Sequence, residues 1–191
     1  MKVKRYFEGG KTDPPKVRVK KGGEDKVYKV NEDFNIDLAK VKKGVKRAES
    51  ANGKLMKSPV STATGFYGQL WSEIKDNPMV KGMSRDMFAS DTTAQNKVFL
   101  KRFTEGIGKG TNILDNTQML YRDYGEQIKK KGYSPEEVAA LTNYIGREGA
   151  RRYFGYHVRD GKPLKEAVPS LFKAKNKTPD EYIAVFRSAF K

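Results

Sequence analysis

The sequence has no cysteine, one histidine and one tryptophan. Without cysteine the chain can form neither disulfides nor thiolate metal sites, and it has no thiol nucleophile. A single histidine, His157, argues against a histidine-based metal centre as well. We therefore expect neither a metal nor another cofactor, and we interpret His157 as structural.

Long hydrophobic runs are also missing. No stretch approaches the roughly 20 apolar residues that a membrane-spanning helix requires, so we expect no membrane span. The opening MKVKRYFEGG is followed by no apolar run, and no secretory signal is expected. At 191 residues, with 37% hydrophobic and 32% charged residues, the chain is typical of one globular domain with an extension.

Positive charge is in large excess, with a formal net charge of +16. Such a charge predicts attraction to polyanions, which include nucleic acid, anionic lipid and acidic wall polymers. The basic residues are scattered among Asp and Glu, and no zinc-finger spacing, phosphate-binding glycine loop or RNA-binding aromatic signature is present. We therefore expect no specific nucleic-acid partner, and the basic surface suits a negatively charged cell envelope.

The composition changes near residues 31 to 35. Residues 1–34 are rich in Lys, Pro and Gly and contain too few apolar residues for a core, which predicts a basic extended arm or tether. Within it, the alternation over residues 16–19 predicts one strand or an extended segment. Residues 35–191 form the predicted domain.

The first helix of the domain carries an apolar stripe at spacings of three and four, formed by Leu38, Val41, Val45 and Ala48. Asn52-Gly53 supplies a helix stop. Glu49 and the residue after it are therefore expected at the C-terminal end of this helix, at the edge of whatever the stripe packs against.

The rest of the domain is predicted to be mainly α. Residues 54–69 favour a loop or a small hairpin, and a helix resumes around Gln69. Apolar periodicity predicts helices at about 92–106 and 116–131. Ser134-Pro135-Glu136-Glu137 and Thr178-Pro179-Asp180-Glu181 each combine a capping hydroxyl, a first-turn proline and a third-position carboxylate, which is typical of a helix start.

Three short motifs follow one another in the first third of the domain: Glu49-Ser50, Ser58-Pro59 and Gly65-Phe66-Tyr67-Gly68-Gln69. Their order, spacing and residue types resemble the lytic transglycosylase pattern of a Glu-Ser pair, a Ser-Pro pair and a Gly-aliphatic-aliphatic-Gln turn. The chain departs from that pattern at Gly68, which stands before Gln69, and at residues 61–62, which lengthen the loop.

A second resemblance lies in residues 141–150, LTNYIGREGA, which look like the helix-Gly-x-x-Gly-Ala element of phage and bacterial lysozyme-like transglycosylases. Asn143 and Tyr144 stand where such proteins often have a histidine or an Ala-Tyr-Asn trio on the helix that closes the saccharide groove. Residues 175–182 are similar to the terminal helix of these phage domains. The resemblance covers roughly residues 35 to 191 and implies a lysozyme-like helical domain.

A glutamic acid can act as the acid in glycosidic cleavage only if its surroundings suit that role. Glycosidic cleavage needs an acid for the leaving oxygen, and a glutamic acid serves near neutral pH only where a partly apolar site raises its pKa. A hydrolase normally needs a second carboxylate. No Asp or Glu occurs between Ser50 and Trp71.

The resemblance implies how one carboxyl could suffice. The C6 hydroxyl of the substrate itself closes onto the anomeric carbon, with Glu49 acting first as acid and then as base. The implied activity is cleavage of the MurNAc-GlcNAc β-1,4 bond of peptidoglycan with a 1,6-anhydromuramyl product. The implied substrate-binding residues are Ser50, Ser58, Thr64, Gly65, Tyr67, Gln69, Asn143 and Tyr144.

Several of these residues have a structural alternative. Ser50 and Thr64 either help to position Glu49 or the sugar, or satisfy backbone groups in a turn. Phe66 and Trp71 are expected in the core, and Tyr67 is the expected exception among these aromatic residues.

In these motifs the sequence looks most like phage virion-associated transglycosylases, which open the cell wall during genome entry. It implies a location in the virion, as a tail or internal component, and action in the bacterial cell envelope. The arm over residues 1–34 would tether the domain to other virion or tail proteins.

The alternative is a structural virion protein that uses an inactive lysozyme-like fold as an assembly module. A third hypothesis is a basic protein that packages nucleic acid. The DNA affinity of such a protein would fall steeply with salt.

Overall fold

The computed structural model describes residues 27–31, 34–51, 53–54, 56–57, 63–107, 112–158 and 177–191, with only the backbone of 156–158. This part of the chain is mainly helical, as the sequence predicts. None of its helices is both long and apolar enough to cross a membrane. In chain order the elements are β1 (Val27–Lys29), β2 (Asn35–Asp37), α1 (Leu38–Ser50), β3 (Ala63–Thr64), β4 (Gln69–Leu70), α2 (Trp71–Ile74), the 3-10 helix η1 (Pro78–Val80), α3 (Arg85–Ser90), α4 (Thr92–Thr104), α5 (Ile113–Lys130), α6 (Pro135–Arg152), the π-helical η2 (Tyr153–Val158) and α9 (Pro179–Ser188).

Helix α1 forms as its apolar stripe predicts. Asp37 caps its N-terminus by accepting hydrogen bonds from the backbone N–H groups of Ala39 and Lys40. The predicted stripe is buried, and Glu49 and Ser50 are the last two residues of the helix. The left-handed residue that ends it is Ala51 (φ 49°) rather than the expected Asn52-Gly53 pair.

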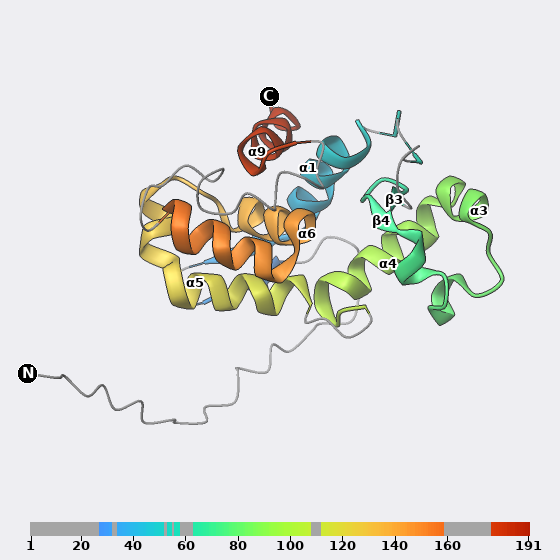
Figure 1. Cartoon of the computed structure of the whole chain (residues 1–191), viewed down its shortest axis with the longest axis horizontal. Helices are drawn as coiled ribbons and strands as arrows, with labels where there is room; N and C mark the ends of the chain where they lie inside the picture. Colours follow the sequence, from blue (N-terminus) through green and yellow to red (C-terminus); the bar gives the residue numbers. More distant parts are fainter. Residues whose placement is uncertain are drawn as a thin grey trace, which may run out of the picture.

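The larger part of the core is built from α1, α5, α6 and α9. Helix α5 packs along α6, and α1 contacts both α6 and α9 (Figure 1). The two capping boxes predicted from the sequence are confirmed, at Ser134 for α6 and at Thr178 for α9. Helix α6 is broken at Gly146, whose φ of 74° and ψ of 175° separate two helical segments.

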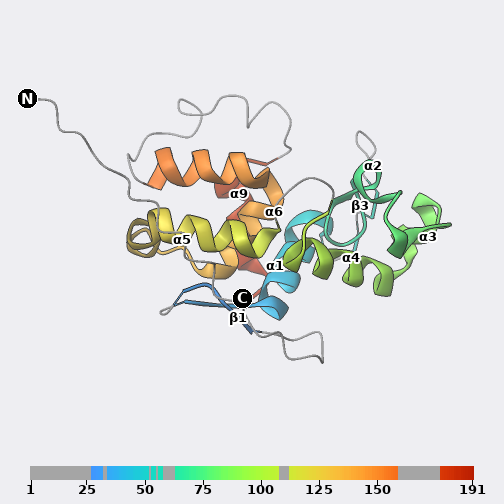
Figure 2. The same cartoon turned by 90° about the horizontal axis from the view of Figure 1, so that it is seen from below.

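A smaller second core is formed by side chains of α2, η1, α3 and α4. Helices α2, α3 and α4 lie at the opposite end of the molecule from α5 (Figure 2). Its fully buried side chains are Ile74, Phe88 and Val98. Helix α4 serves both cores, because its Phe99 and Phe103 belong to the larger one. The predicted hairpin after α1 is present as the antiparallel pair β3–β4, and it lies between the two cores.

Helix positions agree with the sequence within a few residues. Helix α4 spans Thr92–Thr104 against a predicted 92–106. Helix α5 begins three residues before the predicted 116, because Asn112 caps it by accepting from the N–H of Asp115. The short α3 and η1 were not predicted, since neither is long enough to display a helical period.

A second antiparallel pair precedes α1. In its register Tyr28 lies opposite Ile36, and both are buried in the larger core. The Gln118 side chain donates to the carbonyl of Lys29. Residues 27–31, which the sequence analysis assigned to the arm, thus pack on the domain; the alternation at 16–19 lies outside the described residues.

The packing of α1 on α9 yields a stability prediction. A Cβ at Gly44 would lie 2.1 Å from the ring of Phe186 on α9. We expect Gly44→Ala to lower the free energy of unfolding by about 1–3 kcal/mol through overpacking, measured by denaturant unfolding followed by circular dichroism. The matched control is Gly125→Ala in α5, where the nearest atom to a new Cβ is 3.7 Å away. That change should leave stability equal or higher by about 0.5–1 kcal/mol, and equal effects of the two changes would contradict the packing argument.

Candidate active site

The end of α1 is held by Ser50, which fixes the position of Glu49. The Ser50 hydroxyl donates to the carbonyl of Lys46 (2.8 Å) and accepts the N–H of Gly53 (3.0 Å). Its side chain is fully buried, so the hydroxyl satisfies the turn after the helix. Glu49, the neighbouring residue, is only partly buried.

Gly68 lies directly against the Glu49 carboxylate. It closes the turn between β3 and β4, with its N–H donating to the carbonyl of Gly65 (3.3 Å) and with φ of 57°. A Cβ at this position would lie 2.5 Å from Glu49 Oε2. A residue with a side chain would therefore be strained in the backbone and would displace the carboxylate. Gly68, at which the chain departs from the motif that it resembles, is thus the residue that lies against Glu49.

The same turn is clamped from the other side by Gln95 of α4. Its side-chain oxygen accepts the N–H of Phe66 (2.7 Å), and its amide nitrogen donates to the carbonyls of Phe88 (2.8 Å) and Ala89 (2.9 Å). Gln95 is fully buried, and a Cβ at Gly65 would collide with it at 2.7 Å. Sequence reasoning missed Gln95, although a glutamine between Ala94 and Val98 on an apolar helix face is a recognisable signal.

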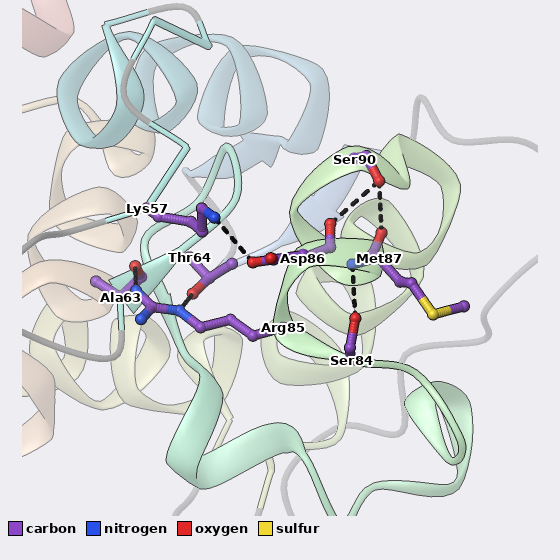
Figure 3. Close-up of polar contacts among 8 residues, drawn as sticks. All are labelled: Lys57, Ala63, Thr64, Ser84, Arg85, Asp86, Met87 and Ser90. Atoms are coloured by element: carbon purple, nitrogen blue, oxygen red, sulfur yellow. Dashed lines mark hydrogen bonds and ion pairs between the residues drawn. The ribbon is translucent and has the colours of Figure 1, made fainter.

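Thr64 and Tyr67, both predicted to bind substrate, anchor the hairpin. The Thr64 hydroxyl accepts from Nε of Arg85 (2.8 Å), which also donates from Nη2 to the carbonyl of Ala63 (3.0 Å; Figure 3). Tyr67, the aromatic residue expected outside the core, is instead buried and stacks on Phe99, with ring centroids 4.2 Å apart. Phe66 and Trp71, expected in the core, are only partly buried. An ion pair between Lys57 and Asp86 (2.8 Å) adds a second link to α3 (Figure 3).

Gln69, which follows Gly68, is the first residue of β4 and has an unusual environment. It is fully buried, and neither atom of its amide has a hydrogen-bond partner within the described part of the chain. Buried side-chain amides are rarely left unpaired in native proteins, and the exceptions are often found at functional or strained positions. Gln69 is thus the predicted residue with the greatest unmet hydrogen-bonding capacity.

Two tyrosines, Tyr144 of α6 and Tyr182 of α9, lie near Glu49. Tyr144 and Tyr182 stack with ring centroids 4.0 Å apart and an interplanar angle of 12°. The Tyr182 hydroxyl is buried within reach of the Glu49 carboxylate and the Asn143 side chain, although neither approach has the geometry of a well-formed hydrogen bond. The predicted Asn143 and Tyr144 therefore do lie near Glu49.

This proximity has consequences for the ionisation of the two tyrosines. Burial, followed by the Glu49 charge, raises the pKa of Tyr182 well above its usual value. Burial raises the pKa of Tyr144 to about 12; its hydrogen bond to the Lys177 backbone opposes this shift, and the Glu49 charge adds to it. Both hydroxyls are consequently neutral across the physiological pH range.

The start of α9 is tied to the same place through Lys177. The Tyr144 hydroxyl donates to the carbonyl of Lys177 (2.8 Å) and accepts its backbone N–H (3.2 Å). The Lys177 ammonium donates to the carbonyl of Ala48 in the last turn of α1 (3.3 Å). The start of α9 is thereby fixed both to α6, through Tyr144, and to the last turn of α1, through Ala48.

The structure thus brings together Glu49, Gly68, Asn143, Tyr144 and Tyr182. Tyr182 was missed by sequence reasoning, because nothing in a helical tyrosine of the last segment signals a contact with residue 49. Ser58 lies outside the described residues. Thr64 and Tyr67 hold the hairpin in place, at positions where their side chains are buried.

Comparisons with protein-family models, with curated proteins and with solved structures found no match for this chain.

The tyrosine environment predicts the alkaline titration of the protein. The pKa is raised by burial in Tyr28, Tyr121, Tyr133, Tyr144, Tyr153 and Tyr182. Since the unfolded chain loses these protons at about 10, stability should fall as the pH rises from about 10 towards 12. Absorbance at 295 nm should show less tyrosinate in the folded than in the urea-unfolded protein near pH 11.

Glu49→Gln makes the same titration specific for the site. Removing the negative charge should bring tyrosinate absorbance to lower pH, because Glu49 raises the pKa of both Tyr144 and Tyr182. Glu126→Gln, at an exposed position of α5, is the matched control and should leave the curve unchanged. Identical curves for all three proteins would mean that Glu49 does not face these tyrosines.

Proposed function

We propose that the protein is a peptidoglycan lytic transglycosylase with a lysozyme-like helical domain and Glu49 as its catalytic residue. The reaction is cleavage of the MurNAc-GlcNAc β-1,4 bond without water, giving a 1,6-anhydromuramyl product. The observation that carries the proposal is the surroundings of Glu49. Its carboxylate is partly buried, is in contact with the backbone of Gly68, and lies near the neutral hydroxyls of Tyr144 and Tyr182.

The proposed chemistry uses one carboxyl group twice. Protonated Glu49 donates its proton to the glycosidic oxygen as the bond to the anomeric carbon breaks. The resulting carboxylate then accepts the proton of the C6 hydroxyl, whose oxygen forms the new bond to the same carbon. Glu49 ends protonated, so the cycle is balanced without an added nucleophile.

The neighbours of Glu49 suit this double role. The neutral Tyr182 hydroxyl can donate to the carboxylate when it is charged, and the absence of a side chain at Gly68 leaves Oε2 in contact with backbone only on that side. Fixing the end of α1 through Ser50 limits the movement of the carboxyl between the two steps. Such preorganisation is a main source of catalytic rate.

The family-level proposal rests on the motifs together with this geometry. The Glu-Ser pair ends a helix, the glycine-bounded turn of residues 65–68 touches the glutamate, and the Asn143-Tyr144 pair lies near it. The location in a phage virion and the tethering role of residues 1–34 rest on the sequence resemblance alone. With residues 27–31 packed on the domain, the tether would be formed by residues before 27.

The test of the proposal is the release of soluble muramyl fragments from purified peptidoglycan sacculi. We expect the wild type to release them and Glu49→Gln to be slower by at least about 100-fold, the contribution typical of a general acid. The matched Glu126→Gln variant should keep full activity, and circular dichroism checks that all three proteins are folded. A folded wild type that releases nothing would instead favour the structural virion module.

A further inference from the structure

Helix α1 carries a large excess of positive charge. It contains Lys40, Lys42, Lys43, Lys46 and Arg47, and its only acidic residue is Glu49. Cations stabilise the C-terminal end of a helix, yet three of these lysines lie in its first half. The helix dipole therefore does not account for these lysines.

Two of the lysines share a flank with Glu49. Lys42, Lys46 and Glu49 follow the i, i+4, i+7 spacing that places residues on one side of a helix. All three are partly exposed. Lys46 lies about one helical turn from Glu49, a rise of about 5 Å along the axis.

The hairpin turn holds Lys46 at this position. Its ammonium lies 3.7 Å from the centroid of the Phe66 ring. Phe66 belongs to the same turn as Gly68, so the turn meets α1 twice, at Lys46 and at Glu49. Among the described residues no carboxylate pairs with Lys46, which leaves a positioned cation beside the carboxyl that would cleave the glycan.

We propose that Lys46 is a specificity-determining residue that binds a carboxylate of the peptide stem of peptidoglycan. This inference rests on the proposed function. The stem is attached through the lactyl group to the same MurNAc ring whose anomeric carbon is attacked, and its amino acids carry free carboxylates. A lysine one helical turn from the catalytic acid is within reach of such a group and supplies a compact point charge.

The chain provides a matched control in Lys43. It lies on the same helix, and its ammonium is 5.1 Å from the centroid of another phenylalanine, Phe190. Lys43 is exposed on the face of α1 towards the C-terminal end of the chain rather than on the Glu49 flank. Lys43→Gln and Lys46→Gln thus remove the same charge and the same kind of ring contact.

The experiment compares two substrates, glycan chains that carry peptide stems and the same chains stripped of stems by an amidase. We expect Lys46→Gln to lower kcat/KM about two- to five-fold on stem-bearing chains, as for one partly exposed ion pair, and to leave stripped chains unaffected. Lys43→Gln should affect neither substrate. Lys46→Arg should restore the preference, and about 0.5 M salt should reduce it by screening.

The outcomes separate the two proposals. If the wild type cleaves both substrates and Lys46→Gln matches it on both, or loses equal activity on both, stem recognition by Lys46 is wrong while the enzyme remains. If the folded wild type cleaves neither substrate, the proposed function fails and the inference with it.

Discussion

The contact between the Glu49 carboxylate and the backbone of Gly68 is the constraint on which the candidate site depends. It requires α1 to end at one place, which Ser50 and the left-handed Ala51 ensure, and it requires the hairpin turn to be held at close approach, which Gln95 ensures. A displacement of about 1 Å at either side would change the surroundings of the carboxyl, and displacements of that size matter greatly for catalysis.

This constraint links segments that are far apart in the chain. The hairpin is anchored to the smaller core through Arg85, whereas Tyr144 and Tyr182 approach Glu49 from the larger core. Helix α1 belongs to the larger core and reaches the hairpin with its last turn. The site therefore forms only when both cores are folded, and α9, near the end of the described chain, is part of it.

Much of this arrangement could be predicted from local sequence. The stripe of α1, the two capping boxes and the turn after Gly65 are encoded by neighbouring residues, and each of these elements is observed. Contacts across the chain could not be predicted in this way. Tyr182 lies near Glu49 only because α9 packs on α1. The place of Gln95 on an apolar helix face indicates that it is buried, but not that its partners are Phe66 in the turn and Phe88 in α3. The burial of Thr64 and Tyr67 could not be predicted either, because a motif indicates position in a pattern and not whether a side chain is buried.

We propose that one carboxyl group, that of Glu49, cleaves the glycan without water. It is tested most directly by digesting sacculi in water enriched in oxygen-18 and analysing the released muramyl ends by mass spectrometry. We expect 1,6-anhydro ends that contain no oxygen-18. Reducing muramyl ends labelled with oxygen-18 would contradict it, because they would require an activated water and a second group to activate it.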